Sequence, residues 1–84
     1  MTTDEMERFV NRYAEDLHVL TMDLVTGESL IGILVRTTDY EDLRKFNLWC
    51  FIESPDILRW KNSGEISLTQ VLDGEVIEQI TTLI

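Results

Sequence analysis

The sequence predicts a mainly β fold in which one N-terminal α-helix precedes a five-stranded, strongly bent antiparallel small barrel. Two periodicities support this fold class. Apolar side chains recur at three- and four-residue steps near the start of the chain, and they alternate with polar side chains over five later segments. The chain has 84 residues, which suits one domain with a single core. We therefore expect one domain over residues 1–84, with the helix at about residues 3–16 and the barrel at about 17–84.

The helix is predicted from its first residues and from its apolar stripe. Thr2 and Glu5 have the spacing of a capping box, and acidic side chains crowd the first turn, where the helix dipole favours them. The stripe consists of Met6, Phe9, Val10, Tyr13 and Leu17. Because a helix of this length is marginal alone, we expect it to pack across one open end of the barrel.

Five strands are expected at residues 18–25, 30–37, 46–53, 65–72 and 76–83. Gly27 and Gly74 lie in the turns before the second and fifth strands, and Pro55 breaks the third strand. Gly32, inside the second strand, indicates a bend or a close approach of two backbones. Residues 38–45 are expected to form a polar connection, whereas residues 57–64 fit either a strand extension or one helical turn.

In the third strand, the alternation puts Phe46, Leu48, Cys50 and Ile52 on one face and Trp49 on the other. We expect Trp49 to pack under the helix or in a subunit interface rather than to stack on a base.

The net charge restricts the classes of partner. Lys and Arg total 7 against 16 Asp and Glu, which gives −9 and argues against a broad polyanion-binding surface or docking on an anionic membrane. The charge is −5 over residues 1–35 and −4 over residues 62–84, whereas residues 36–61 hold five bases and five acids. A local basic surface is therefore expected only within residues 36–61.

Residues 19–34 resemble the first signature of the Sm-like (LSm) family. Gly27 and Glu28 stand at its turn, and Gly32 and Leu34 match its Gly-x-Leu. The stretch 46–48 is similar to the family's Asn-containing start of strand 3, after a longer loop, and Asp39 is the nearest candidate for the family Asp. Residues 72–77 have the outline of the second signature, with Asp73 where the family has Arg.

The resemblance implies an SH3-like small barrel (the Sm-like fold) and a ring of roughly six or seven subunits, in which strand 4 of one subunit pairs with strand 5 of the next. It also implies a non-catalytic role in RNA or DNA processing through single-stranded nucleic acid bound near the pore. Asn47 would read a base, Lys45 would stack on it and Gly74 would shape the second loop, whereas Asp73 would repel phosphate.

Residues 59–61 form the one place where an aromatic side chain lies between two bases, so they could stack a base and pair a phosphate, or Trp60 could fold back over hydrophobic side chains. The complete set of residues expected to contact nucleic acid is Arg36, Asp39, Arg44, Lys45, Asn47, Arg59, Trp60, Lys61, Asp73 and Gly74.

The last strand independently favours an oligomer. Residues 79–84 contain no charged side chain and no Pro, and an exposed edge of this kind pairs readily with another chain. The alternative is that strand 1 of the same barrel covers it. The expected interface residues are Leu68, Gln70, Val76, Ile80 and Thr82, and a lysine at Ile80 is expected to break the seam.

No residue set supports catalysis, a cofactor, a metal site or a small-molecule substrate. His18 is the only histidine, and Cys50 is the only cysteine and is expected to be a buried apolar residue. Asp39, Glu41 and Asp42 fit a solvated acidic loop better than a metal site. The absence of a secretory signal and of a disulfide pair favours a cytoplasmic location. The alternative function is a small-barrel protein-interaction or structural module that does not bind nucleic acid, favoured by Asp73, the net charge and the unguarded last strand.

Overall fold

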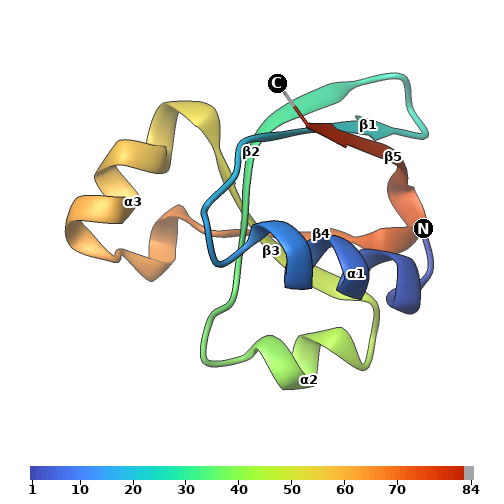
Figure 1. Ribbon diagram of the computed structural model, residues 1–84, viewed down its shortest axis with the longest axis horizontal. Coiled ribbons are helices and arrows are strands. Elements are labelled where there is room, and N and C mark those ends of the chain that lie inside the picture. The colour runs from blue at the N-terminus through green and yellow to red at the C-terminus, as the bar shows by residue number, and fades with distance from the viewer. Residues whose placement is uncertain (83–84) are drawn as a thin grey trace.

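The computed structural model describes residues 1–82 and consists of one helix followed by a five-stranded antiparallel sheet with further short helices (Figure 1). In chain order the elements are α1 (Thr3–Tyr13), β1 (Leu20–Leu24), β2 (Ser29–Val35), α2 (Tyr40–Arg44), β3 (Leu48–Glu53), α3 (Ile57–Ser63), β4 (Gln70–Asp73) and β5 (Ile77–Thr82). Single 3₁₀ turns lie at Ser54–Asp56, Ile66–Leu68 and Gly74–Val76. No helix within residues 1–82 has the length and apolar character needed to cross a membrane.

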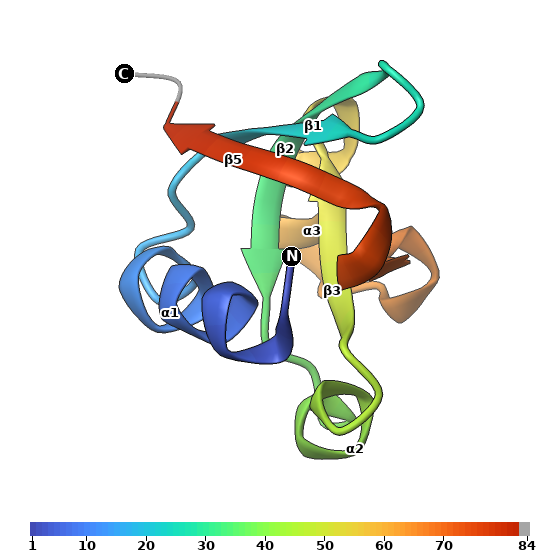
Figure 2. The same ribbon diagram turned by 90° about the vertical axis from the view of Figure 1, so that its right-hand side faces the viewer.

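The strand order is β4-β3-β2-β1-β5, so the last strand pairs with the first. Figure 2 shows β1 and β5 crossing steeply over the direction of β2 and β3, and the sheet is strongly bent. The N-terminal helix and the five antiparallel strands are confirmed. Within residues 1–82 the sheet ends at β4 on one side and at β5 on the other and does not close, so the expected small barrel is not confirmed.

Gly32 lies in β2 at a point where the neighbouring strand β3 leaves no space for a side chain. A Cβ atom at this position would collide with the carbonyl oxygen of Ile52 and would lie 2.6 Å from the ring of Phe51. The close approach predicted from the sequence is therefore confirmed, and it allows two strands to meet where the sheet bends.

The core has two parts, one on each face of the sheet. On the first face α1 packs against the sheet through Met6, Val10 and Ala14, which meet a cluster formed by Leu20, Met22, Leu34, Trp49, Phe51, Ile77 and Ile80. Trp49 is 1% exposed in this cluster, which confirms that it packs under the helix. The second face carries Ile33, Val35, Cys50 and Ile52, against which Leu17, Val19, Leu43, Ile57, Trp60 and Leu68 pack. Both faces of β2 and β3 are thus covered.

The structure corrects several of the element boundaries expected from the sequence and decides the one that was left open. The helix ends at Tyr13 rather than near residue 16, because Leu17 has a positive φ of 52° and packs against the second face. The expected polar connection contains α2, and residues 57–63 take the helical alternative.

The strand expected at 65–72 is wrong over residues 65–69 and begins only at Gln70. Phe46 precedes β3 and is 74% exposed, so it does not share a buried face with Cys50. The expected fifth strand begins at Ile77, and its last expected residue, Leu83, lies outside the described residues.

Candidate functional site

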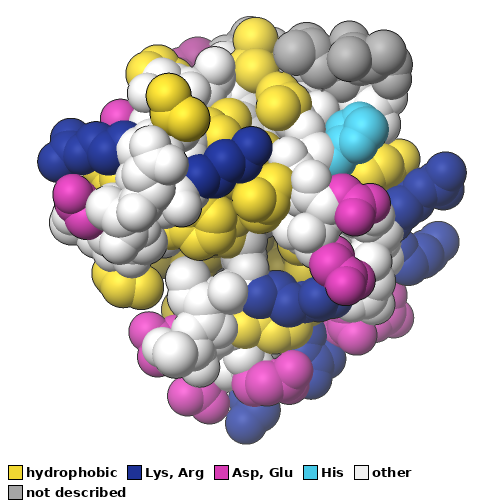
Figure 3. All heavy atoms as spheres, turned by 60° about the vertical axis from the view of Figure 1, so that its left-hand side comes forward, with side chains coloured by type: hydrophobic (Ala, Val, Ile, Leu, Met, Phe, Trp, Pro, Cys, Tyr) yellow, Lys and Arg dark blue, Asp and Glu magenta, His cyan; other side chains and the backbone are white. Residues whose placement is uncertain are grey.

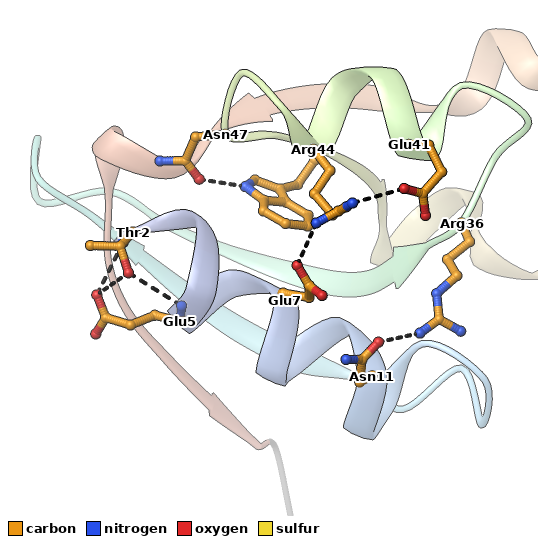
Figure 4. A network of polar contacts seen from close by, with 9 residues as sticks. Thr2, Glu5, Glu7, Asn11, Arg36, Glu41, Arg44 and Asn47 are labelled. Carbon is orange, nitrogen blue, oxygen red and sulfur yellow. Dashed lines mark hydrogen bonds and ion pairs between the residues drawn. The ribbon is translucent and has the colours of Figure 1, made fainter.

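Asn47, the expected base reader, is bonded inside the protein. It lies between α2 and β3 with a φ of 58°, a conformation that Asn tolerates better than most residues. Its side-chain Oδ1 accepts a hydrogen bond of 2.7 Å from Nε1 of Trp49 (Figure 4). Its Nδ2 donates a hydrogen bond of 2.9 Å to the carbonyl oxygen of Met1. Each polar atom of the amide therefore has a protein partner, which leaves less of it to bind a base.

The loop around Gly74, which corresponds to the expected second loop, is hydrogen-bonded to Asn47. The backbone N–H of Gly74 donates to the carbonyl oxygen of Asn47 at 2.8 Å, and a Cβ on Gly74 would collide with the Asn47 amide. Asp73 caps the adjacent 3₁₀ turn, because its Oδ1 accepts a hydrogen bond of 2.9 Å from the backbone N–H of Glu75. Asp73 thus has a local structural role that an arginine could not perform.

Replacing Asn47 separates its two structural contributions. In Asn47→Gly the positive φ is tolerated, but the indole N–H of buried Trp49 loses its acceptor. The free energy of unfolding should therefore fall by about 1–3 kcal/mol. Asn47→Ala should lose a further 1–2 kcal/mol or so through backbone strain. Chemical denaturation of the three proteins measures both steps. Equal stability of Asn47→Gly and the unsubstituted protein would show that the side-chain bonds contribute nothing.

Carboxylates neutralise most of the expected phosphate-binding cations. Arg44 pairs with Glu41 at 2.8 Å and Glu7 at 2.9 Å, and hydrogen bonds to these carboxylates raise the pKa of its guanidinium. Lys45 lies 3.9 Å from Asp42. Arg59 lies 3.1 Å from Glu65. Each pair lowers the local positive potential that would attract a phosphate.

Arg36 is the exception among the arginines of residues 36–61. Its Nη2 donates a hydrogen bond of 2.6 Å to Oδ1 of Asn11, and its guanidinium lies over the Tyr40 ring at 5.5 Å from the centroid (Figure 4). Within residues 1–82 it forms no ion pair with a carboxylate. The two contacts orient this exposed side chain, and neither of them neutralises its charge.

Arg36 and Trp60 line the same pocket, of about 380 Å³, with Ala14, Glu15, Leu17 and Val35. Arg59 and Lys61 flank Trp60 on α3, and neither Lys61 nor exposed Asp39 forms an ion pair in the part of the chain that the structure describes. The structure therefore joins two of the expected residues, Arg36 and Trp60, and separates both from Asn47 and Gly74, which lie in the bonded cluster around the β4–β5 turn.

Sequence reasoning missed a second set of cations. Arg8 and Arg12 line a smaller pocket of about 220 Å³ on α1, beside the stacked rings of Phe9 and Tyr13, and neither forms an ion pair among the described residues. The net charge of residues 1–35 is negative because acids outnumber bases there, so a basic surface was not expected in this segment. Their spacing of four residues on one helix face was the available signal.

The expected interface residues have different environments. Val76 is 38% exposed, and Thr82 is exposed. Gln70 is half-buried and donates a hydrogen bond of 2.6 Å to Glu53, and half-buried Leu68 packs on the second core face. Ile80 is 6% exposed in the first core cluster, so a lysine there would disturb the core rather than a seam.

No group of three or more His, Cys, Asp and Glu side chains that could hold a metal occurs within residues 1–82. His18 lies beside the Tyr13 ring at 5.1 Å, and Cys50 is buried with Thr37 Oγ1 at 3.6 Å. The buried environment predicted for Cys50 is confirmed. Comparison with protein-family models, curated proteins and solved structures gives no match to this chain.

Proposed function

We propose that this protein is a non-catalytic assembly module whose two open sheet edges pair with each other between copies of the same chain. The observation that carries the proposal is the strand order, in which β4 and β5 each have one strand neighbour within residues 1–82. An edge strand presents a row of backbone donors and acceptors that a second chain can satisfy. Pairing β4 of one copy with β5 of the next is head-to-tail, so it produces a ring if the rotation closes.

The side chains of both edges are compatible with such a seam. The outer strand β4 contains exposed Val71, with 52% of its surface accessible, and β5 contains Glu78 as its one charged residue. Neither strand carries Lys or Pro, the residues that natural proteins use to block edges. The proposal agrees with the ring that the Sm-like resemblance implies.

Single-stranded nucleic acid binding is supported less well. Asn47 and Gly74 are engaged in internal contacts, and Arg44, Lys45 and Arg59 face carboxylates. The two functions have opposite salt dependences. Assembly of chains that each carry −9 should strengthen as salt screens their repulsion, whereas nucleic-acid binding should weaken.

Val71→Lys is the sharpest test of the seam. It puts a charge at an exposed position on the β4 edge, so it should reduce a multi-subunit assembly to monomers while changing the unfolding free energy by only about 0.5 kcal/mol. Light scattering or native mass spectrometry measures the assembly, and circular dichroism checks the fold.

Val25→Lys is the matched control, because Val25 is 60% exposed in the turn after β1 and belongs to neither edge strand. It should leave the assembly intact. A monomer at every concentration for the unsubstituted protein, or an assembly that Val71→Lys does not change, would refute the proposed seam.

A further inference from the structure

We propose that the pocket between the end of α1, the end of β2 and α3 binds a small aromatic molecule that carries a single carboxylate. This inference does not depend on the assembly proposal. The pocket has a volume of about 380 Å³, at the small end of the range for ligand sites. Figure 3 shows the side of the molecule that carries α3, where hydrophobic side chains line a hollow and both basic and acidic side chains border it.

Arg36 supplies the site for the carboxylate. One hydrogen bond to Asn11 and the contact with the Tyr40 ring hold the guanidinium, and its other N–H groups form no bond within residues 1–82. A planar guanidinium matches a carboxylate through two parallel hydrogen bonds. Arg36 is exposed, and because these two contacts orient its guanidinium, less conformational entropy is lost on binding than for a surface arginine that lacks such contacts.

Trp60 and the apolar lining supply the site for the ring. Trp60 is half-buried and packs on the second core face, so its indole is held while part of it remains accessible. Ala14 and Val35 are buried and Leu17 is half-buried, so the pocket offers an apolar surface beside the indole. Aromatic rings gain from this combination of area and ring-to-ring contact.

Glu15 limits the ligand to one negative charge. It is exposed on the same pocket as Arg36, and it forms no ion pair in the described part of the chain. A second anionic group would meet this carboxylate and the overall charge of −9, whereas a monocarboxylate can direct its one charge toward Arg36. The charges therefore favour a small monocarboxylate over an oligonucleotide.

The test is a titration of the full chain that is monitored by ¹⁵N-resolved NMR. The three probes have the same phenylpropyl skeleton and differ in their polar group: 3-phenylpropanoate, 3-phenylpropan-1-ol and 3-phenylpropylamine. The carboxylate should bind at least about tenfold more tightly than the alcohol, and the amine most weakly. The shifted amide signals should include Leu17 and Val35, together with the indole N–H of Trp60. Equal affinity for all three probes, or shifts confined to other residues, would overturn the proposal.

Two variants test whether Arg36 and Glu15 determine the preference for a carboxylate. Arg36→Gln should abolish the preference for the carboxylate over the alcohol, and Glu15→Gln should strengthen carboxylate binding. Arg12→Gln removes an exposed arginine outside this pocket and should change neither. A ten-residue oligothymidylate should fail to displace 3-phenylpropanoate. If the oligonucleotide instead displaced 3-phenylpropanoate, the pocket would be assigned to single-stranded nucleic acid and the proposal would be refuted.

Discussion

Gly32→Ala should destabilise the protein by more than about 3 kcal/mol, because the new methyl group has no space. It would collide with a backbone carbonyl of β3, and a backbone oxygen in a paired strand cannot rotate away as a flexible side chain can. For a chain of this length the total stability is expected to be roughly 4–13 kcal/mol. Thermal and chemical denaturation followed by circular dichroism measures the loss.

Gly27→Ala and Gly64→Ala are the matched controls. Both glycines have positive φ, of 93° and 66°, but a Cβ on either meets nothing within 4 Å. They should cost about 1–2 kcal/mol through backbone strain alone. If Gly32→Ala were no more destabilising than these two, the close approach of β2 and β3 would not constrain the fold.

Ile80→Lys should destabilise the protein by at least about 4 kcal/mol and leave much of it unfolded. The side chain of Ile80 is buried beside α1, and its partner in the β1–β5 ladder, Met22, is also buried. An ammonium group there would lose its hydration without gaining a carboxylate partner. Urea unfolding measures the change in free energy.

The control for Ile80→Lys is Thr81→Lys, one position along β5. Thr81 is exposed, so a lysine there keeps its hydration and should leave the unfolding free energy within about 0.5 kcal/mol of the unsubstituted value. A folded Ile80→Lys protein of ordinary stability would contradict the burial of this side chain. Loss of assembly in Ile80→Lys cannot serve as a test of the seam, because unfolding alone explains it.

Local signals made much of the fold predictable. The capping box of Thr2 and Glu5 is present in both directions, with hydrogen bonds of 3.2 Å and 3.0 Å. The alternation that predicted the first, second and third strands reflects side chains that pack on opposite faces of one sheet. The same alternation put Trp49 on the face opposite Cys50 and Ile52, which the two core clusters confirm.

The rest depended on contacts that sequence spacing does not reveal. The short helix α2 lies against β3, where Tyr40 meets the Trp49 ring edge-on at 6.0 Å, and this contact is made by residues from two elements. At the candidate site, Asn47 is bonded to Met1 and Arg36 to Asn11, partners far away along the chain. No local pattern indicates that these polar side chains are already engaged.

The pairing of the last strand with the first has a consequence for how the chain folds. The strands β1 to β4 follow each other in both sequence and space, so each of their pairings closes only the connection between two consecutive strands. The ladder between β1 and β5 instead closes a loop that contains most of the sheet, and this costs more chain entropy. Because β5 contributes Ile77 and Ile80 to the cluster under α1, that cluster is complete only when this longest loop has closed. Closure of this loop is therefore the step expected to limit the folding rate.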